Sequence, residues 1–199
     1  MKLVRIGALV AVVVAVAGCA VLPTGRTIGA TATTELHNAE RRAVGTALLT
    51  QINAGVRVVV EVRGLAPGAK AVHIHEVGRC EAPAFNSAGN HFNPDGRQHG
   101  LLNPRGPHAG DLPNITIEAD GSGRLETTTD RITLGAGSTS LFDGDGSALV
   151  VHGSADDFMT DPTGNSGARV ACGVIVKQEQ QSEPSDPSGL GPASREATI

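Results

Sequence analysis

From about residue 34 onward, short apolar and β-branched segments alternate with turn-forming residues. Seven segments have the length and composition of strands, and Gly, Pro, Asn or Asp separates them. No long stretch repeats apolar residues at helical spacing. The pattern therefore predicts an all-β domain. The predicted strands are 43–49, 55–62, 71–77, 114–118, 124–129, 148–151 and 169–176.

The chain on either side of this region has a different composition. We expect residues 178–199 to be disordered, because Gln, Glu, Ser, Pro and Gly bury little apolar surface. Residues 19–33 read as a flexible tether. The remaining domain, 34–177, has roughly 145 residues, which is enough for a proper core. With no Trp, no Tyr and four Phe, that core must rely on Val, Leu, Ile and Ala.

The first 18 residues have the features of an export signal. Lys2 and Arg5 precede an apolar run from 6 to 17, and small residues lead to Cys19. This arrangement resembles a bacterial lipoprotein signal peptide, which is cut before a cysteine that then carries lipid. A plain secretory signal or an uncleaved anchor is the alternative, although the run is short for crossing a bilayer. We therefore expect an exported protein that is lipid-anchored through Cys19 to the extracytoplasmic face of the bacterial cell membrane.

Three histidines are associated with predicted strands. Because successive side chains of a strand point to opposite faces, His73 and His75 point the same way and can hold one ion together. His152 directly follows the apolar run 148–151, so a second buried strand can bring it to the same place. Imidazole is a suitable ligand for copper and zinc. We interpret His37, which lies apart from this series, as an ordinary core or surface residue.

Four further metal-binding side chains lie in a predicted loop. The stretch 86–114 is rich in Gly, Pro and Asn, which predicts neither helix nor strand. Loops of this length inside compact domains are usually functional. A carboxylate among imidazoles suits zinc. Together with the strand histidines, this loop offers enough nitrogen and oxygen donors for two metals. The loop side chains are His91, His99, His108 and Asp111.

The sequence around these side chains resembles that of bacterial copper,zinc superoxide dismutases. The motifs follow one another in family order from about residue 33 to 177. A single motif would be weak, since histidines two residues apart are common in strands, but the complete ordered set is specific. The motifs include His73-Ile74-His75-Glu76, Gly89-Asn90-His91-Phe92, Gln98-His99-Gly100, Pro107-His108-Ala109-Gly110-Asp111, Val151-His152-Gly153 and Gly167-Ala168-Arg169-Val170-Ala171-Cys172-Gly173.

The resemblance implies one copper and one zinc ion per subunit. It also implies that one histidine bridges the two ions after losing both ring protons, which flanking cations make feasible near neutral pH. The implied copper ligands are His73, His75, His91 and His152. The implied zinc ligands are His91, His99, His108 and Asp111.

Three more residues acquire implied roles. Asp156 corresponds to a carboxylate that hydrogen-bonds one ligand of each metal, here His73 and His99, and so fixes their orientation. Arg169 corresponds to the arginine that attracts and orients the anion beside copper. Thr163 corresponds to a threonine that lines the channel.

Two cysteines remain after Cys19 is assigned to lipid. An even pair in an exported protein is expected to form a disulfide. In the family, the pair that matches Cys80 and Cys172 ties the metal-bearing loop to the last strand. The chain-entropy model gives such a bridge roughly 4–5 kcal/mol of stabilisation.

The resemblance further implies an eight-stranded antiparallel Greek-key β-sandwich or barrel with long metal-binding loops, an architecture already associated with this family. The implied reaction is dismutation of the superoxide anion to dioxygen and hydrogen peroxide. Copper would change oxidation state, His91 would carry a proton to the product, and redox-inert zinc would be structural. No nucleic-acid partner is expected, and a homodimer is left open.

Two other functional classes use similar residues. A non-enzymatic copper- and zinc-binding lipoprotein would need the same ligands, but neither Arg169 nor an intact bridge at His91. A zinc hydrolase would need a general base, and no unassigned carboxylate stands near the histidines. The sequence therefore favours the dismutase.

The chain departs from the better-known family pattern in two places. The loop 153–168 has no Lys or Arg, and without its leader the chain keeps 14 basic and 20 acidic residues, so its net charge repels anions at long range. We therefore expect cations of the metal loop to aid Arg169. Lys70 and Ala71 replace a Gly-aromatic pair that is common among relatives. The expected helper cations are Arg79, Arg97 and Arg105.

Overall fold

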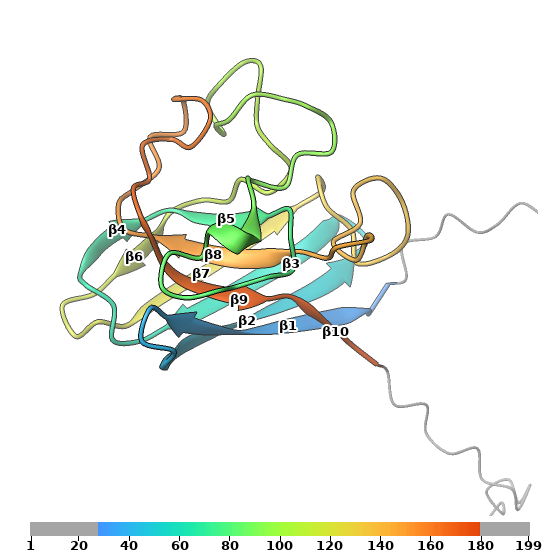
Figure 1. Ribbon diagram of the computed structural model, residues 1–199. Helices are drawn as coiled ribbons and strands as arrows, with labels where there is room; N and C mark the ends of the chain where they lie inside the picture. The colour runs from blue at the N-terminus through green and yellow to red at the C-terminus, as the bar shows by residue number, and fades with distance from the viewer. Residues whose placement is uncertain (1–27, 180–199) are drawn as a thin grey trace, which may run out of the picture.

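The computed structural model describes residues 28–179, which form ten strands and one short 3-10 helix, without an α-helix (Figure 1). The predicted leader at 1–18, Cys19 and most of the predicted tether and tail lie outside the described residues. Within that range, no helix is long and apolar enough to cross a membrane. The elements are β1 (Thr31–Asn38), β2 (Ala43–Ile52), β3 (Gly55–Val62), β4 (Gly68–Lys70), β5 (Val72–His75), η1 (Asn86–Ala88), β6 (Ile115–Ile117), β7 (Gly123–Thr129), β8 (Ala148–His152), β9 (Arg169–Val174) and β10 (Val176–Gln178).

The strands form one curved antiparallel sheet, which makes a nearly closed barrel (Figure 1). Their order is β4-β6-β7-β3-β2-β1-β9-β8-β5, and β10 pairs with β1. β5 and β6 are consecutive strands in the chain, but β5 is at one end of this order and β6 is next to the other end, so the loop between them crosses the barrel. This confirms the expected all-β Greek-key architecture.

The ten strands outnumber the eight expected. β4 and β10 have only three residues each, which is too short to show an alternating pattern. β1 begins at Thr31, within the stretch that was predicted to be a tether. The sequence pattern does not reveal this start, because Thr and Ala alternate there without large apolar side chains. Ala32 is nevertheless fully buried.

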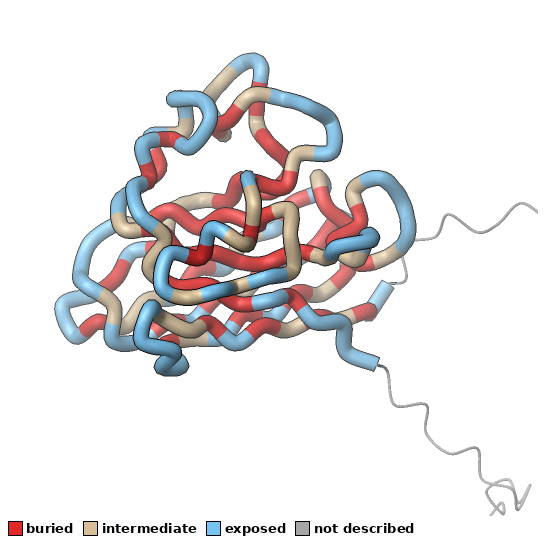
Figure 2. The backbone as a smooth tube through the Cα atoms, in the orientation of Figure 1, coloured by how far each residue is buried: buried red, intermediate tan, exposed pale blue. Residues whose placement is uncertain are grey.

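Alternation within the strands builds the core. In β3, Val56, Val58 and Val60 are fully buried, whereas Arg57 and Glu61 on the opposite face are exposed. Figure 2 shows buried stretches following the strands and exposed stretches at the loops. The interior therefore holds one continuous aliphatic cluster, as expected for a chain with few aromatic residues.

A disulfide joins Cys80, in the loop after β5, to Cys172 in β9, with 5.6 Å between the Cα atoms. The expected pairing is therefore confirmed. Beneath this loop, Phe85, Ala88 and Val150 form a second small buried cluster with Cys172. Bridge and cluster together fasten the start of the long loop to the barrel.

Candidate metal centre

Two neighbouring strands and a long loop deliver the candidate ligands. β5 carries His73 and His75, and it pairs antiparallel with β8, which ends at His152. As the strand period predicts, both β5 histidines face the centre, and Ile74 between them packs in the core. The loop returns to β5 through isolated bridges that pair its residues with the two histidines. These bridges join His73 to Asp111 and His75 to His91.

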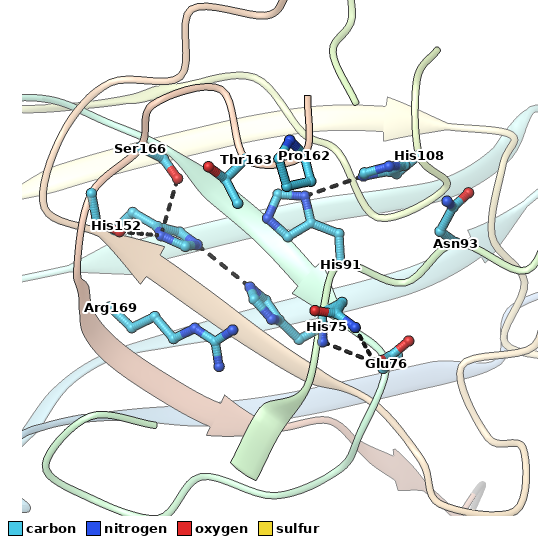
Figure 3. Close-up of a pocket in the computed structure, with 12 residues that line it drawn as sticks. His75, Glu76, His91, Asn93, His108, His152, Pro162, Thr163, Ser166 and Arg169 are labelled. Atoms are coloured by element: carbon cyan, nitrogen blue, oxygen red, sulfur yellow. Dashed lines mark hydrogen bonds between the residues drawn. The ribbon is translucent and has the colours of Figure 1, made fainter. Parts of the chain in front are cut away.

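The first cluster of donor atoms consists of four buried imidazoles within 4.8 Å of one another. The Nε2 atoms of His75 and His152 are 3.4 Å apart (Figure 3). Nδ1 of His73 and Nε2 of His91 are buried without a hydrogen-bond partner. Such orphaned atoms are rare in native proteins, so this cluster fits a metal ion. Its members are His73, His75, His91 and His152.

The second cluster surrounds a buried carboxylate. Oδ1 of Asp111 lies 3.0 Å from Nδ1 of His91, 3.1 Å from Nδ1 of His99 and 3.5 Å from Nδ1 of His108. The other carboxylate oxygen accepts hydrogen bonds from the backbone N–H groups of Gly100 and His108. These contacts fix the carboxylate and leave Oδ1 facing three imidazoles, a donor set that suits zinc.

His73 also comes within 4.8 Å of the second cluster, but its free nitrogen belongs to the first. Its Nε2 is hydrogen-bonded to Asp156, which leaves only Nδ1 for a metal. His108 is the better fourth donor of the second cluster, since its Nδ1 lies 3.4 Å from Nδ1 of His91. His91 therefore directs one nitrogen at each cluster.

Asp156 ties the two clusters together. Its Oδ2 is 2.8 Å from Nε2 of His73, and its Oδ1 is 3.0 Å from Nε2 of His99. Asn114 holds the Asp156 backbone through two hydrogen bonds. Gly164 adopts φ +62°, and a Cβ there would overlap the Asp156 carboxylate. The close approach thus requires glycine.

Burial and charge set the protonation of the metal-free centre. Burial lowers the pKa of His75 to about 2 and that of His152 to about 3. Burial also lowers the pKa of His91 to about 4, against a hydrogen bond to Asp111 that raises it. At His99, burial is outweighed by Asp111 and Asp156, which raise the pKa to about 9. The first cluster therefore offers neutral imidazoles at neutral pH.

A cavity of about 500 Å³ opens above the first cluster, and His75, His91 and His152 lie in its wall (Figure 3). Arg169 and Thr163 also line it. The Arg169 guanidinium donates hydrogen bonds of 2.6 Å to two backbone carbonyl groups, those of Phe85 and Gly89.

Arg169 is the one cation among the residues described around this cavity. Arg79, Arg97 and Arg105 are exposed and do not line it. The expectation that they aid Arg169 in attracting the anion stays a prediction, because a charge outside the cavity lining can still act on an anion at long range. Arg97 instead donates to the carbonyl of Gly106, within the metal loop itself.

Three contacts at the centre were not foreseen. Asp161 accepts a 2.6 Å hydrogen bond from the backbone N–H of His99. Lys70 donates to the carbonyl of Gly153, and the Ser166 hydroxyl meets Nδ1 of His152. The partners in the first two contacts are 62 and 83 residues apart, so no local motif signals them. The side chain of His37 is 41% exposed and lies outside the centre, near Glu35.

The chain is similar in sequence to known proteins. The family model described as copper/zinc superoxide dismutase matches residues 43–175. Cu-Zn superoxide dismutase 2 of Aquifex aeolicus is 50% identical over 143 residues, which cover 71% of this chain and 84% of that protein. The Cu-Zn superoxide dismutase of Caulobacter vibrioides is 44% identical over 147 residues, covering 72% and 84%.

A solved structure has the same fold. The crystal structure of a superoxide dismutase-like protein from Bacillus subtilis is 40% identical and superposes with a TM-score of 0.69, covering 71% of this chain and 96% of that one. Sequence, fold and the geometry of the two donor clusters agree, and the chain belongs to the copper/zinc superoxide dismutase family.

Proposed function

We propose that this protein dismutates superoxide, converting two superoxide anions and two protons to dioxygen and hydrogen peroxide. The observation that carries the proposal is the pair of buried donor clusters that share His91 beneath a cavity containing Arg169. Family membership and relatives named Cu-Zn superoxide dismutase support it.

The two clusters favour different metals. The first consists of imidazoles, three of which line the cavity, so an ion held there is within reach of substrate. The second contains the carboxylate of Asp111, which suits zinc in a four-ligand structural site. When bound, copper in the first cluster supplies one-electron exchange with superoxide, and zinc in the second supplies fixed charge without redox chemistry.

The side chains of the protein then have separate tasks. Arg169 places a fixed positive charge in the cavity, because two carbonyl groups hold its guanidinium, and it can therefore orient an anion beside His75. Nε2 of His91 has no protein partner, so it is the atom at which a proton can be held for the peroxide product. Asp156 keeps one ring of each cluster in place.

The test combines metal content with dismutation, using mature protein and a His152→Ala variant. We expect about one copper and one zinc per chain, with fast dismutation that the variant loses because a ligand of the first cluster is gone. Both metals bound without dismutation would favour the alternative, a non-enzymatic copper- and zinc-binding lipoprotein.

We also propose that the protein is exported and lipid-anchored to the extracytoplasmic face of the bacterial cell membrane. The basic start, the apolar run and Cys19 support this location. Metabolic labelling with a fatty acid should mark the full-length protein and leave a Cys19→Ala variant unlabelled. Equal labelling of both would contradict anchoring at Cys19.

A further inference from the structure

One hydroxyl group beside the first cluster has no role in the proposed function so far. Ser166 lies in the loop between β8 and β9, where it is fully buried and borders the cavity. Its Oγ is 3.2 Å from Nδ1 of His152, the ring nitrogen on the far side from His75 (Figure 3). The hydroxyl therefore contacts a candidate copper ligand at the ring nitrogen that faces away from the first cluster.

The three strand histidines of the cluster differ in how their second nitrogen is held. A buried carboxylate holds that of His73 at 2.8 Å, and the Gly89 carbonyl lies 3.0 Å from Nδ1 of His75. The backbone acceptor of His152 is more distant, since the Gly167 carbonyl lies 3.3 Å from its Nδ1. The backbone contact alone therefore holds the ring of His152 less closely than the other two rings are held, and a second hydrogen-bond partner at Nδ1 would add to it.

The backbone fixes where the hydroxyl lies. The N–H of Ser166 donates to the carbonyl of Thr163, and its own carbonyl accepts from the N–H of Ser154. Gly167 follows with φ +75°, which turns the chain towards β9. The side chain of Ser166 is fully buried, so replacing it with alanine removes a hydrogen-bond partner that Nδ1 of His152 has in the folded protein.

We propose that Ser166 is a positioning residue for His152. When Nε2 of His152 binds a metal, Nδ1 must carry the ring proton, and the Ser166 hydroxyl shares that N–H with the Gly167 carbonyl. This contact fixes the ring plane and directs Nε2 into the first cluster. The inference rests on the proposed copper site. It adds Ser166, for which the family resemblance implies no role, to the residues that orient the metal ligands.

The test measures copper affinity by chelator competition in zinc-loaded protein, together with the electron paramagnetic resonance spectrum of bound Cu(II). In Ser166→Ala, we expect about tenfold weaker copper binding and an altered spectrum, as is typical when an outer partner of a metal ligand is lost. Zinc affinity should stay unchanged. Ser166→Thr, which restores a hydroxyl, should bring both copper measurements back towards those of the unmodified protein.

Ser154→Ala is the matched control, because it removes an exposed hydroxyl from the same loop, and it should leave both measurements unchanged. Unaltered copper affinity and spectrum in Ser166→Ala would overturn the role of Ser166 alone. An equal loss of zinc affinity would also overturn it, since that result indicates general damage. Absence of copper binding in the unmodified protein would overturn the proposed function as well.

Discussion

At the scale of single residues, Asp156 makes the contact that most directly couples the two clusters. One oxygen of an amide can accept hydrogen bonds, whereas both carboxylate oxygens accept them here. Asp156→Asn should therefore release the ring of His99, whose contact with Asp156 is the longer of the two, and weaken zinc binding about 10- to 100-fold. Zinc competition with a chelator measures this, and unchanged zinc affinity would contradict the coupling.

Gly164 leads to a related prediction, because its α-carbon lies against the same carboxylate. Gly164→Ala introduces a Cβ at positive φ and into the space of Asp156, so we expect loss of zinc affinity comparable to that of Asp156→Asn. Gly96→Ala is the control, since that glycine also has positive φ but nothing within 4 Å of the added carbon. A similar zinc loss in both variants would assign the effect to backbone strain alone.

Substitution of Arg169 should lower the rate of dismutation without changing the metal content. Its guanidinium reaches two carbonyl groups at once, which a lysine ammonium matches less well. We expect kcat/KM for superoxide to fall at least about tenfold in Arg169→Ala and less in Arg169→Lys, with copper and zinc content retained. Pulse radiolysis measures the rate. Loss of metal together with activity would make Arg169 a structural residue instead.

At the scale of elements, strand alternation and local motifs determined what could be predicted. β3 is a β-branched run with buried residues at every second position from Val56, and turn residues precede and follow it, so its bounds were predicted as found. β4 and β10 are too short for any period to emerge, and the start of β1 has only small side chains. The candidate ligands were identifiable because the family motifs surround them. The contacts of Lys70, Asp161 and Ser166 depend on how loops meet in space, which a single sequence does not encode locally.

Lys70 shows how one such contact can join two elements. It ends β4, and its ammonium donates a 2.7 Å hydrogen bond to the Gly153 carbonyl, one residue after the candidate ligand His152. Lys70→Met keeps the apolar stem but removes the donor, so the free energy of unfolding should fall by about 1 kcal/mol. Urea denaturation measures this change. Arg79→Met, which removes an exposed cation from the loop after β5, should leave stability nearly unchanged.

At the scale of the whole molecule, the metal centre lies where β5, β8 and two loops meet, so its protonation affects the stability of the entire fold. In metal-free protein, burial holds the pKa values of His75, His91 and His152 well below the usual 6.5. The unfolded chain therefore binds more protons than the folded chain below pH 6.5. His99, with its pKa raised to about 9, acts oppositely, but it is protonated in both states in that acidic range.

Stability of the metal-free protein should consequently fall as pH decreases from 6.5 towards 4, by up to about 1.4 kcal/mol per pH unit for each of the three histidines. As pH rises from 6.5 through 9, the contribution of His99 should be lost. Urea denaturation of chelator-treated protein at pH 7, 6 and 5 measures the acid slope. Metal-loaded protein is the control, because bound metals stabilise the folded state and engage the same nitrogen atoms, so its midpoint should remain higher throughout. If the free energy of unfolding of metal-free protein did not change between pH 7 and pH 5, the buried histidines would not be the source of its pH dependence.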